Sequence, residues 1–111
     1  MKRFAANRVC LVAEKEILRN YVVEVDEVTH QVIRYFCLHE EIQQTEWKGG
    51  IILITSAMPN RVEGESFQDF LDRISKEEEG KIHGMLCYAY PITAFDVNSM
   101  EFTPKSQILS F

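Results

Sequence analysis

The sequence predicts a mainly β domain with one packed α-helix, built as a β-sandwich or a partly open barrel whose strands are mostly antiparallel. Short apolar runs typical of strands fill most of the chain, and a single helical stripe of apolar residues interrupts them. Strands precede and follow that helix, whereas a parallel α/β sheet would alternate strands with helices. The 111 residues, of which 46% are hydrophobic, suffice for one domain with one core.

The first part of the domain, residues 1–58, is expected to hold the N-terminal strands. Residues 4–13 and 17–25 are apolar runs rich in β-branched residues, and the second run alternates between two faces. Residues 31–39 are apolar on both faces, which predicts a strand that is buried on both sides.

A tryptophan and a glycine pair lead into the most apolar run of the chain. Trp47 and Gly49-Gly50 precede residues 51–54, which consist of isoleucine and leucine alone. We expect a short buried strand there. The glycine pair is not a phosphate-binding loop, because it precedes a strand and lacks the lysine and hydroxyl partners of such loops.

The second part, residues 59–80, is expected to be a loop followed by the helix. Ser66 is a favourable N-cap, Asp69 lies in the first turn, and Gly80 is expected to end the helix. Acidic residues 77–79 are expected to face solvent. The apolar stripe has the spacing i, i+3, i+4, i+7 and consists of Phe67, Phe70, Leu71 and Ile74.

The last part, residues 81–111, is expected to return to strands. Residues 85–95 form a strongly apolar run, and residues 107–111 form a final short strand. Pro91 lacks an amide hydrogen, so it is expected at a sheet edge or a bulge.

Charge and cysteine content narrow the classes of function. The net charge of −5 argues against a nucleic-acid partner, and no apolar run is long enough to cross a membrane. The odd number of cysteines argues against a disulfide framework, and Cys10, Cys37 and Cys87 are expected to be reduced, buried and inert. These features predict a cytoplasmic protein, and no cofactor is expected.

The order of the motifs resembles the small β-sandwich that flanks the catalytic barrel of amidohydrolases, the metal-dependent hydrolases that include cytosine and guanine deaminases and dihydroorotases. The resemblance covers residues 3–58 and 84–111, and it implies a β-sandwich in which the two ends of the chain meet. The matching stretches are Ala6-Asn7-Arg8-Val9, residues 20–26, Gln31-Val32-Ile33, residues 47–52, Phe95-Asp96-Val97 and residues 102–109.

The chain departs from that family where the catalytic barrel would begin. In an amidohydrolase the apolar strand leads to Pro-Gly-hydrophobic-x-Asp-x-His-x-His, and the two histidines bind a divalent metal that activates water. Here the strand leads to Thr55-Ser56-Ala57-Met58-Pro59. The barrel of roughly 250 residues is absent, and residues 59–80 stand in its place. The resemblance therefore implies a fold without the family's activity, and no catalytic residue carries over.

One alternative is a small metal-binding protein or enzyme. Cys37 and His39 are two residues apart on one strand face, and with Cys87 or His83 they would supply the thiolate and imidazole ligands of a metal site or a nucleophilic pair. Paired Cys-x-x-Cys spacing, which structural zinc sites use, is absent. The other interpretation of these residues is a core thiol and a histidine at a strand end.

The hypothesis that the sequence favours is a non-catalytic interaction module, acting as a homodimer or on a protein partner. Trp47 is the candidate interface residue, and its other interpretation is a cover for the edge of the sheet. A small-molecule binder that uses Tyr35, Tyr88 and Tyr90 in a cleft is a third possibility.

Overall fold

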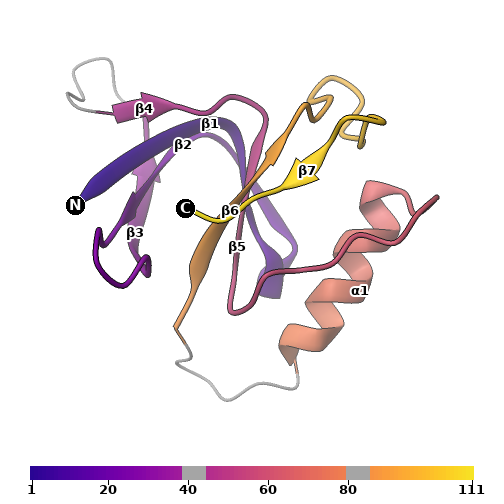
Figure 1. The fold of residues 1–111 in the computed structure, drawn as a ribbon, viewed down its shortest axis with the longest axis horizontal. Coiled ribbons are helices and arrows are strands. Elements are labelled where there is room, and N and C mark those ends of the chain that lie inside the picture. Colours follow the sequence, from indigo (N-terminus) through magenta and orange to yellow (C-terminus); the bar gives the residue numbers. More distant parts are fainter. Residues whose placement is uncertain (39–44, 80–85) are drawn as a thin grey trace.

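The computed structural model describes residues 1–38, 45–79 and 86–111, and it consists of one seven-stranded sheet, not closed, with one helix (Figure 1). The strands lie in the order β3-β2-β1-β5-β6-β7, and β4 also pairs with β1. The mainly β fold with one packed helix is thus confirmed. The elements are β1 (Lys2–Leu11), a 3-10 turn η1 (Val12–Glu14), β2 (Glu16–Val25), β3 (Val32–Cys37), β4 (Thr45–Trp47), β5 (Ile51–Thr55), α1 (Phe67–Glu79), β6 (Tyr88–Thr93) and β7 (Gln107–Ile108).

Strand β1 is the centre of the sheet, because it has partners along both edges. It pairs with β2 in antiparallel fashion on one side, and with β4 and β5 in parallel fashion on the other. The other pairings, β2 with β3, β5 with β6 and β6 with β7, are antiparallel. The sheet is therefore mostly antiparallel, as expected, but the two parallel pairings were not predicted.

The glycine pair bends the chain between β4 and β5, so that both strands follow the same edge of β1. Gly49 and Gly50 have φ angles of 65° and 54°, which lie in the left-handed region that glycine adopts without a steric penalty. A Cβ atom on Gly50 would lie only 3.2 Å from the carbonyl oxygen of Ile92. This close approach, together with the backbone conformation, explains why glycine occupies the bend at positions 49 and 50.

The curved sheet encloses an inner core. Its buried side chains come from β1, β2, β5 and β6, and the ring of Phe111 stacks on that of Phe4 with 3.9 Å between centroids. Near the opening of the curve the amide of Val32 donates to the carbonyl of Cys87, and a bridge joins Gln31 to Tyr88. The inner core consists of Phe4, Ala6, Val9, Leu11, Val23, Val25, Ile52, Ile54 and Ala89.

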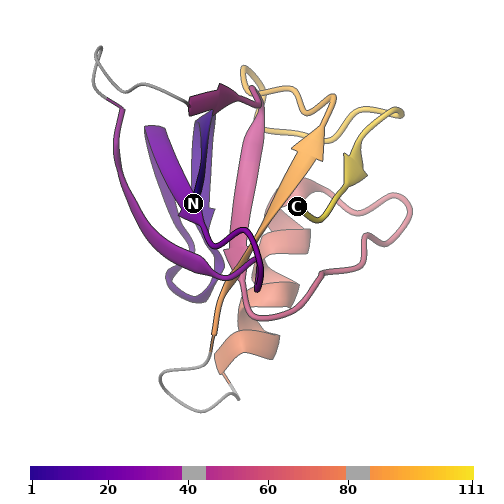
Figure 2. The ribbon, with the colours of Figure 1, turned by 60° about the vertical axis from the view of Figure 1, so that its left-hand side comes forward.

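The helix packs on the outer face of β5 and β6 and forms a second core there (Figure 2). All four residues of the apolar stripe predicted for the helix are buried, which confirms that stripe. The rings of Phe67, Phe70, Phe95 and Phe102 meet at centroid distances of 4.9–6.1 Å, mostly edge to face. Within the described residues, no helix combines the length and apolar composition that crossing a membrane demands.

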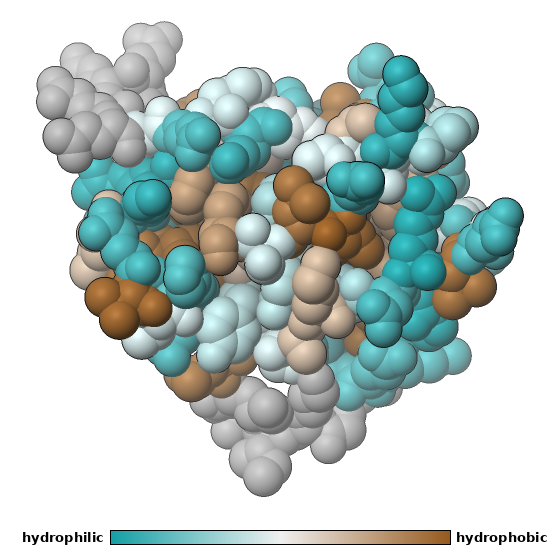
Figure 3. Space-filling model, in the orientation of Figure 1, coloured by the Kyte–Doolittle hydropathy of each residue, from teal (hydrophilic) through white to brown (hydrophobic). Residues whose placement is uncertain are grey.

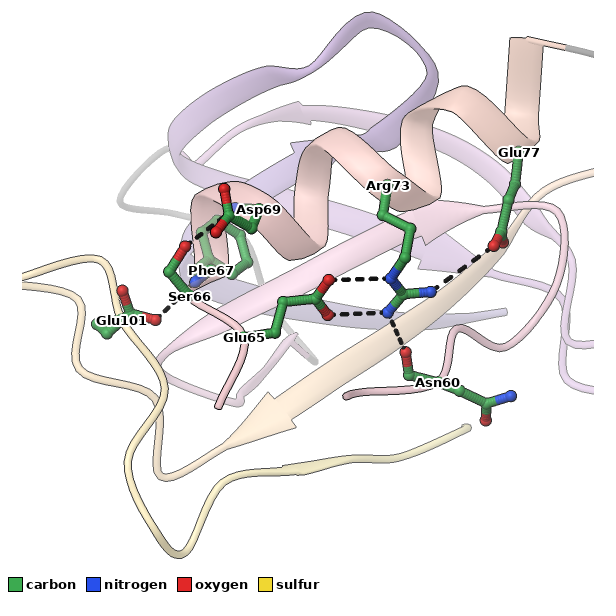
Figure 4. A network of polar contacts seen from close by, with 8 residues as sticks. All are labelled: Asn60, Glu65, Ser66, Phe67, Asp69, Arg73, Glu77 and Glu101. Atoms are coloured by element: carbon green, nitrogen blue, oxygen red, sulfur yellow. Dashed lines mark hydrogen bonds and ion pairs between the residues drawn. The ribbon is translucent and has the colours of Figure 1, made fainter. Parts of the chain in front are cut away.

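Two side chains satisfy the first amides of α1. The hydroxyl of Ser66 accepts a hydrogen bond from the amide of Asp69 at 3.1 Å, which confirms the predicted N-cap. The carboxylate of Glu101, from the segment before β7, accepts a hydrogen bond from the amide of Phe67 at 2.6 Å (Figure 4). An acidic group at this end of the helix also complements the helix dipole. The expected stop at Gly80 lies outside the described residues.

Strand β3 corrects one prediction. It was expected to be buried on both faces, yet most of its residues are exposed, including Ile33 and Tyr35. The reason is its place at the end of the sheet, where it pairs with β2 among the described strands, while α1 packs on β5 and β6. Cys37, at the end of this strand, is likewise exposed rather than buried.

Strand β6 accommodates Pro91 inside the sheet. The carbonyl of Pro91 accepts a hydrogen bond from the amide of Leu109, so the proline nitrogen faces the side of β7. Strand β7 ends at Ile108, so the missing amide hydrogen costs no regular ladder bond. The edge position expected for Pro91 is thus found beside the end of β7, the last strand of the sheet.

Candidate interaction surface

Trp47 lies at one end of an apolar row that crosses four strands on the outer face of the sheet. The register pairs Trp47 with Ala5, Ala5 with Val22, and Val22 with Phe36. Ala5 and Val22 are buried, Phe36 is half-buried, and Trp47 is 54% exposed. Neighbours across strands share a face, so these four side chains form one continuous strip, called here the Trp47 row.

A charged row runs beside the Trp47 row, two residues along each strand. It consists of Arg3, Glu24 and Arg34, which are neighbours in register on β1, β2 and β3. Nε of Arg3 lies 3.0 Å from Oε2 of Glu24, and Nη2 of Arg34 lies 3.3 Å from the same oxygen. The guanidinium of Arg34 also stands over the ring of Phe36, 4.9 Å from its centroid.

The carboxylate of Glu24 is ionised at neutral pH although its residue is buried. The hydrogen bond from Arg3 is the main reason that the pKa of Glu24 lies below its usual value, and the bond from Arg34 adds to it, while burial opposes the shift. Both guanidinium groups thus bind the same carboxylate oxygen of Glu24. One feature of the sequence points to this site, because Glu24 alternates with Val23 and Val25 on an apolar strand.

The candidate metal ligands are only partly placed. His39 and His83 lie outside the described residues. Cys37 ends the exposed strand β3, and Cys87 is half-buried before β6 and packs against the inner core. Among residues 1–38, 45–79 and 86–111, no cluster of three or more histidine, cysteine, aspartate or glutamate side chains has the geometry to hold a metal ion.

Two of the described thiols, those of Cys10 and Cys87, are also poor nucleophiles. Burial raises the pKa of Cys10 to about 12. Burial is the main cause of the raised pKa of Cys87, and the negative charges of Glu78 and Glu14 add to it. A thiol with a raised pKa is protonated at neutral pH, and the thiolate is the form that attacks substrates or binds metals.

The three tyrosines of the expected cleft do not line one cavity. Tyr90 is buried in the core beneath α1, and Tyr88 packs against that same core. Tyr35 lies on β3 instead, with its ring centroid 6.4 Å from that of Tyr21. The cleft hypothesis therefore fails because β6 and β3 direct these rings to different parts of the molecule.

The acidic end of α1 is less exposed than its sequence suggests. Oε1 of Glu78 accepts hydrogen bonds from both hydroxyls of the Thr55-Ser56 pair and from the amide of Ser56. Thr55 ends β5 and Ser56 follows it, at the position where an amidohydrolase continues toward its metal ligands. Here the segment is fastened to the helix, a contact that residue spacing alone did not reveal.

A hollow of about 270 Å³ lies at the end of the sheet near Phe4 and Phe111. Several of its charged groups have a neighbour that interacts with them. Lys48 lies 3.5 Å from Glu46, and the carboxylate of Asp26 accepts two backbone amides of its own turn. The lining carries charges of both signs, so the hollow gives no argument for function.

Comparison of the chain with protein-family models, with curated proteins and with solved structures finds no match. The surface described above therefore carries the functional argument. Its main features are an exposed tryptophan, an apolar row and two arginines that share one buried carboxylate.

Proposed function

We propose that this chain is a non-catalytic β domain, a stand-alone relative of the amidohydrolase accessory domain, that acts by self-association through the Trp47 row. The order of its sequence motifs supports the relationship, and the replacement of the His-x-His segment by Thr55 and Ser56 supports the lack of hydrolase chemistry. The odd number of cysteines argues against a disulfide framework and suits a reducing compartment, which supports a cytoplasmic location.

The observation that carries the proposal is the Trp47 row with its arginine neighbours. Tryptophan and arginine are the residues most enriched among those that dominate binding energy at interfaces. Here Trp47 is 54% exposed on a sheet face that, over this part of the sheet, α1 does not cover. A large indole left half in water at the end of a buried apolar strip gains most when a partner covers it.

The geometry of the row favours a second copy as that partner. Trp47 and Phe36 lie at opposite ends of the row, three strand spacings or about 14 Å apart. In a two-fold interface, a residue that lies away from the axis meets a different residue of the other copy, and the contact occurs twice. The indole of each copy is then placed over Phe36 and Arg34 of the other, where aromatic and cation–π contacts are both available.

Light scattering on the purified chain tests the proposal. We expect a dimer whose dissociation constant lies in the micromolar range, and we expect Trp47→Ser to weaken it by at least about tenfold. Val28→Ser is the matched control, because Val28 is 86% exposed in a turn away from the row. Trp47 is the only tryptophan, so its fluorescence should shift to shorter wavelength as the dimer forms. A chain that stays monomeric at about 1 mM, the weak end of specific association, overturns the proposal.

A further inference from the structure

We propose that the groove between β7 and residues 58–61 binds an extended, acidic segment of a partner protein, which adds a strand to the edge of the sheet. This inference is independent of the Trp47 row, which involves β1 to β4. The groove has a volume of about 360 Å³ and is lined by Met58, Pro59, Asn60, Arg61, Ser106, Gln107, Ile108 and Leu109.

The backbone of β7 presents one amide and one carbonyl to this groove. The amide of Leu109 donates to the carbonyl of Pro91, and the amide of Gln107 donates to the hydroxyl of Thr93, so both amides face β6. Backbone groups of successive strand residues point to opposite sides. The amide and carbonyl of Ile108 therefore point away from β6, toward the groove, where a strand from a partner would meet them.

The opposite wall is held in place by side chains. The carbonyl of Asn60 accepts a hydrogen bond from Arg73 of α1, and a two-point ion pair with Glu65 fixes that arginine (Figure 4). A wall fixed before binding lowers the entropy cost of receiving a ligand. It also limits what enters, since a second wall beside β7 admits a single extended segment more readily than the sheet edge of a folded copy.

The side chains along the groove define the chemistry of the segment. Met58 is 49% exposed and Leu109 is 40% exposed, which provides an apolar contact on either side of the strand edge. In Figure 3 a hydrophobic area lies near the centre of the view, in the region where Figure 1 draws β7, with hydrophilic residues around it. Strand addition selects alternate side chains through such contacts.

Arg61 is the reason that we expect the bound segment to be acidic. Its Nη1 lies 3.3 Å from the carbonyl oxygen of Ser106, and its guanidinium stands 4.2 Å from the ring centroid of Phe102. Within the described residues, the ion pairs include none with Arg61, so no carboxylate neutralises it. A carboxylate on the bound segment would complete this arrangement with charge-assisted hydrogen bonds.

A pair of capped pentapeptides tests the inference. The probe is acetyl-Ser-Val-Glu-Val-Ser-amide, and its counterpart carries Gln in place of Glu. Titration into isotope-labelled protein, followed by amide NMR shifts, should move the Ile108 signal, and the Glu peptide should bind about fivefold to tenfold more tightly than the Gln peptide. Arg61→Gln should remove that preference, and Arg61→Lys should retain most of it.

Lys105→Gln is the matched control, because Lys105 is an exposed cation near β7 that does not line the groove. It should leave both affinities within about twofold. Ile108→Pro removes the outward amide and should abolish binding, while the Arg61 pair keeps the test valid if that variant unfolds. No shift at Ile108, or equal binding of the two peptides, overturns the inference. So does a dimer that Ile108→Pro breaks and Trp47→Ser leaves intact, because the groove would then hold a second copy.

Discussion

The outer face of the sheet has two halves of opposite character. Over β5 and β6 the face is covered by α1, and four phenylalanine rings interlock beneath the helix. Over β4, β1, β2 and β3 the face carries one narrow apolar row ending in Trp47, with a charged row beside it. The same sheet thus buries its apolar surface beneath the helix in one half and exposes part of it to solvent in the other.

The two halves of the sheet face therefore have different roles: the covered half contributes mainly to stability, and the open half presents the surface proposed for interaction. The covered half contributes burial, which scales with apolar area removed from water. The open half contributes cross-strand side-chain pairs and the hydrogen bonds of one buried carboxylate. Each of these adds less to the free energy of unfolding. Substitutions in the covered half should therefore have the largest effects on folding, those at the buried carboxylate of the open half smaller ones, and a substitution of Trp47 should act mainly on association. The predictions below test that separation, beginning with the largest effect.

The largest effect is expected for Phe70→Ala. Phe70 is fully buried beneath the helix and contacts two other rings at 5.2 and 6.1 Å between centroids. Truncation to alanine removes its burial and leaves a cavity, so the free energy of unfolding should fall by about 3–5 kcal/mol in urea denaturation. A loss below about 1 kcal/mol would contradict the picture of a tightly packed helix half.

Gly50→Ala should be next, with a loss of about 2 kcal/mol in the free energy of unfolding. The variant faces both a left-handed φ of 54° and a carbonyl oxygen 3.2 Å from the new methyl group. Gly64→Ala provides the matched comparison, since Gly64 has a φ of 80° but no atom within 4 Å of the added carbon. It should lose only about 1 kcal/mol, the cost of the backbone alone. Equal losses would show that the close approach at the bend is unimportant.

Glu24→Gln should lower the free energy of unfolding by about 1–2 kcal/mol at pH 7, because the two arginines lose their shared anion. The pKa of Glu24 is depressed in the folded state, so its stabilising effect is present above the unfolded value of about 4.3 and is lost as pH falls through the lower folded value. The difference between wild type and variant should therefore shrink on acidification. A difference that is constant between about pH 7 and pH 2 would contradict this assignment.

The smallest effect on folding is expected for Trp47→Ser. Trp47 is 54% exposed, so the free energy of unfolding of the dilute monomer should change by less than about 0.5 kcal/mol. Urea denaturation well below the dimer dissociation constant measures this quantity. A large loss would place Trp47 with Phe70 among the folding residues and would remove the contrast between the two halves.

Much of the fold was predictable because it follows from local pattern. The stripe Phe67, Phe70, Leu71 and Ile74 has helical spacing, and each member is buried as expected. Strand β3 was mispredicted for a physical reason. Apolar residues on both faces indicate burial only if the strand lies inside the sheet, and strand position depends on long-range pairing that alternation does not encode.

Only one residue of the candidate surface, Trp47, could be predicted from the sequence. Trp47 is visible as a lone tryptophan, but the residues that complete its row lie 11 to 42 positions away along the chain and meet it through the register of β1, β2 and β3. The same holds for Arg3 and Arg34, which reach Glu24 across 21 and 10 positions. The parallel pairing of β1 with β4 brings Trp47 beside Ala5, and that pairing has no local sequence signal.

The double pairing of β1 has a consequence for how the chain is made. During synthesis one edge of β1 pairs with β2 as soon as residues up to Val25 have emerged, whereas its second edge waits for β5, which ends at Thr55. The outer edge of β5 in turn waits for β6, which ends at Thr93. Until then the nascent chain carries an unpaired, apolar strand edge of the kind that recruits other chains. We expect fragments that stop short of Thr93 to aggregate and those that continue through β6 to remain dispersed, so that β6 marks the point at which the growing chain covers this edge.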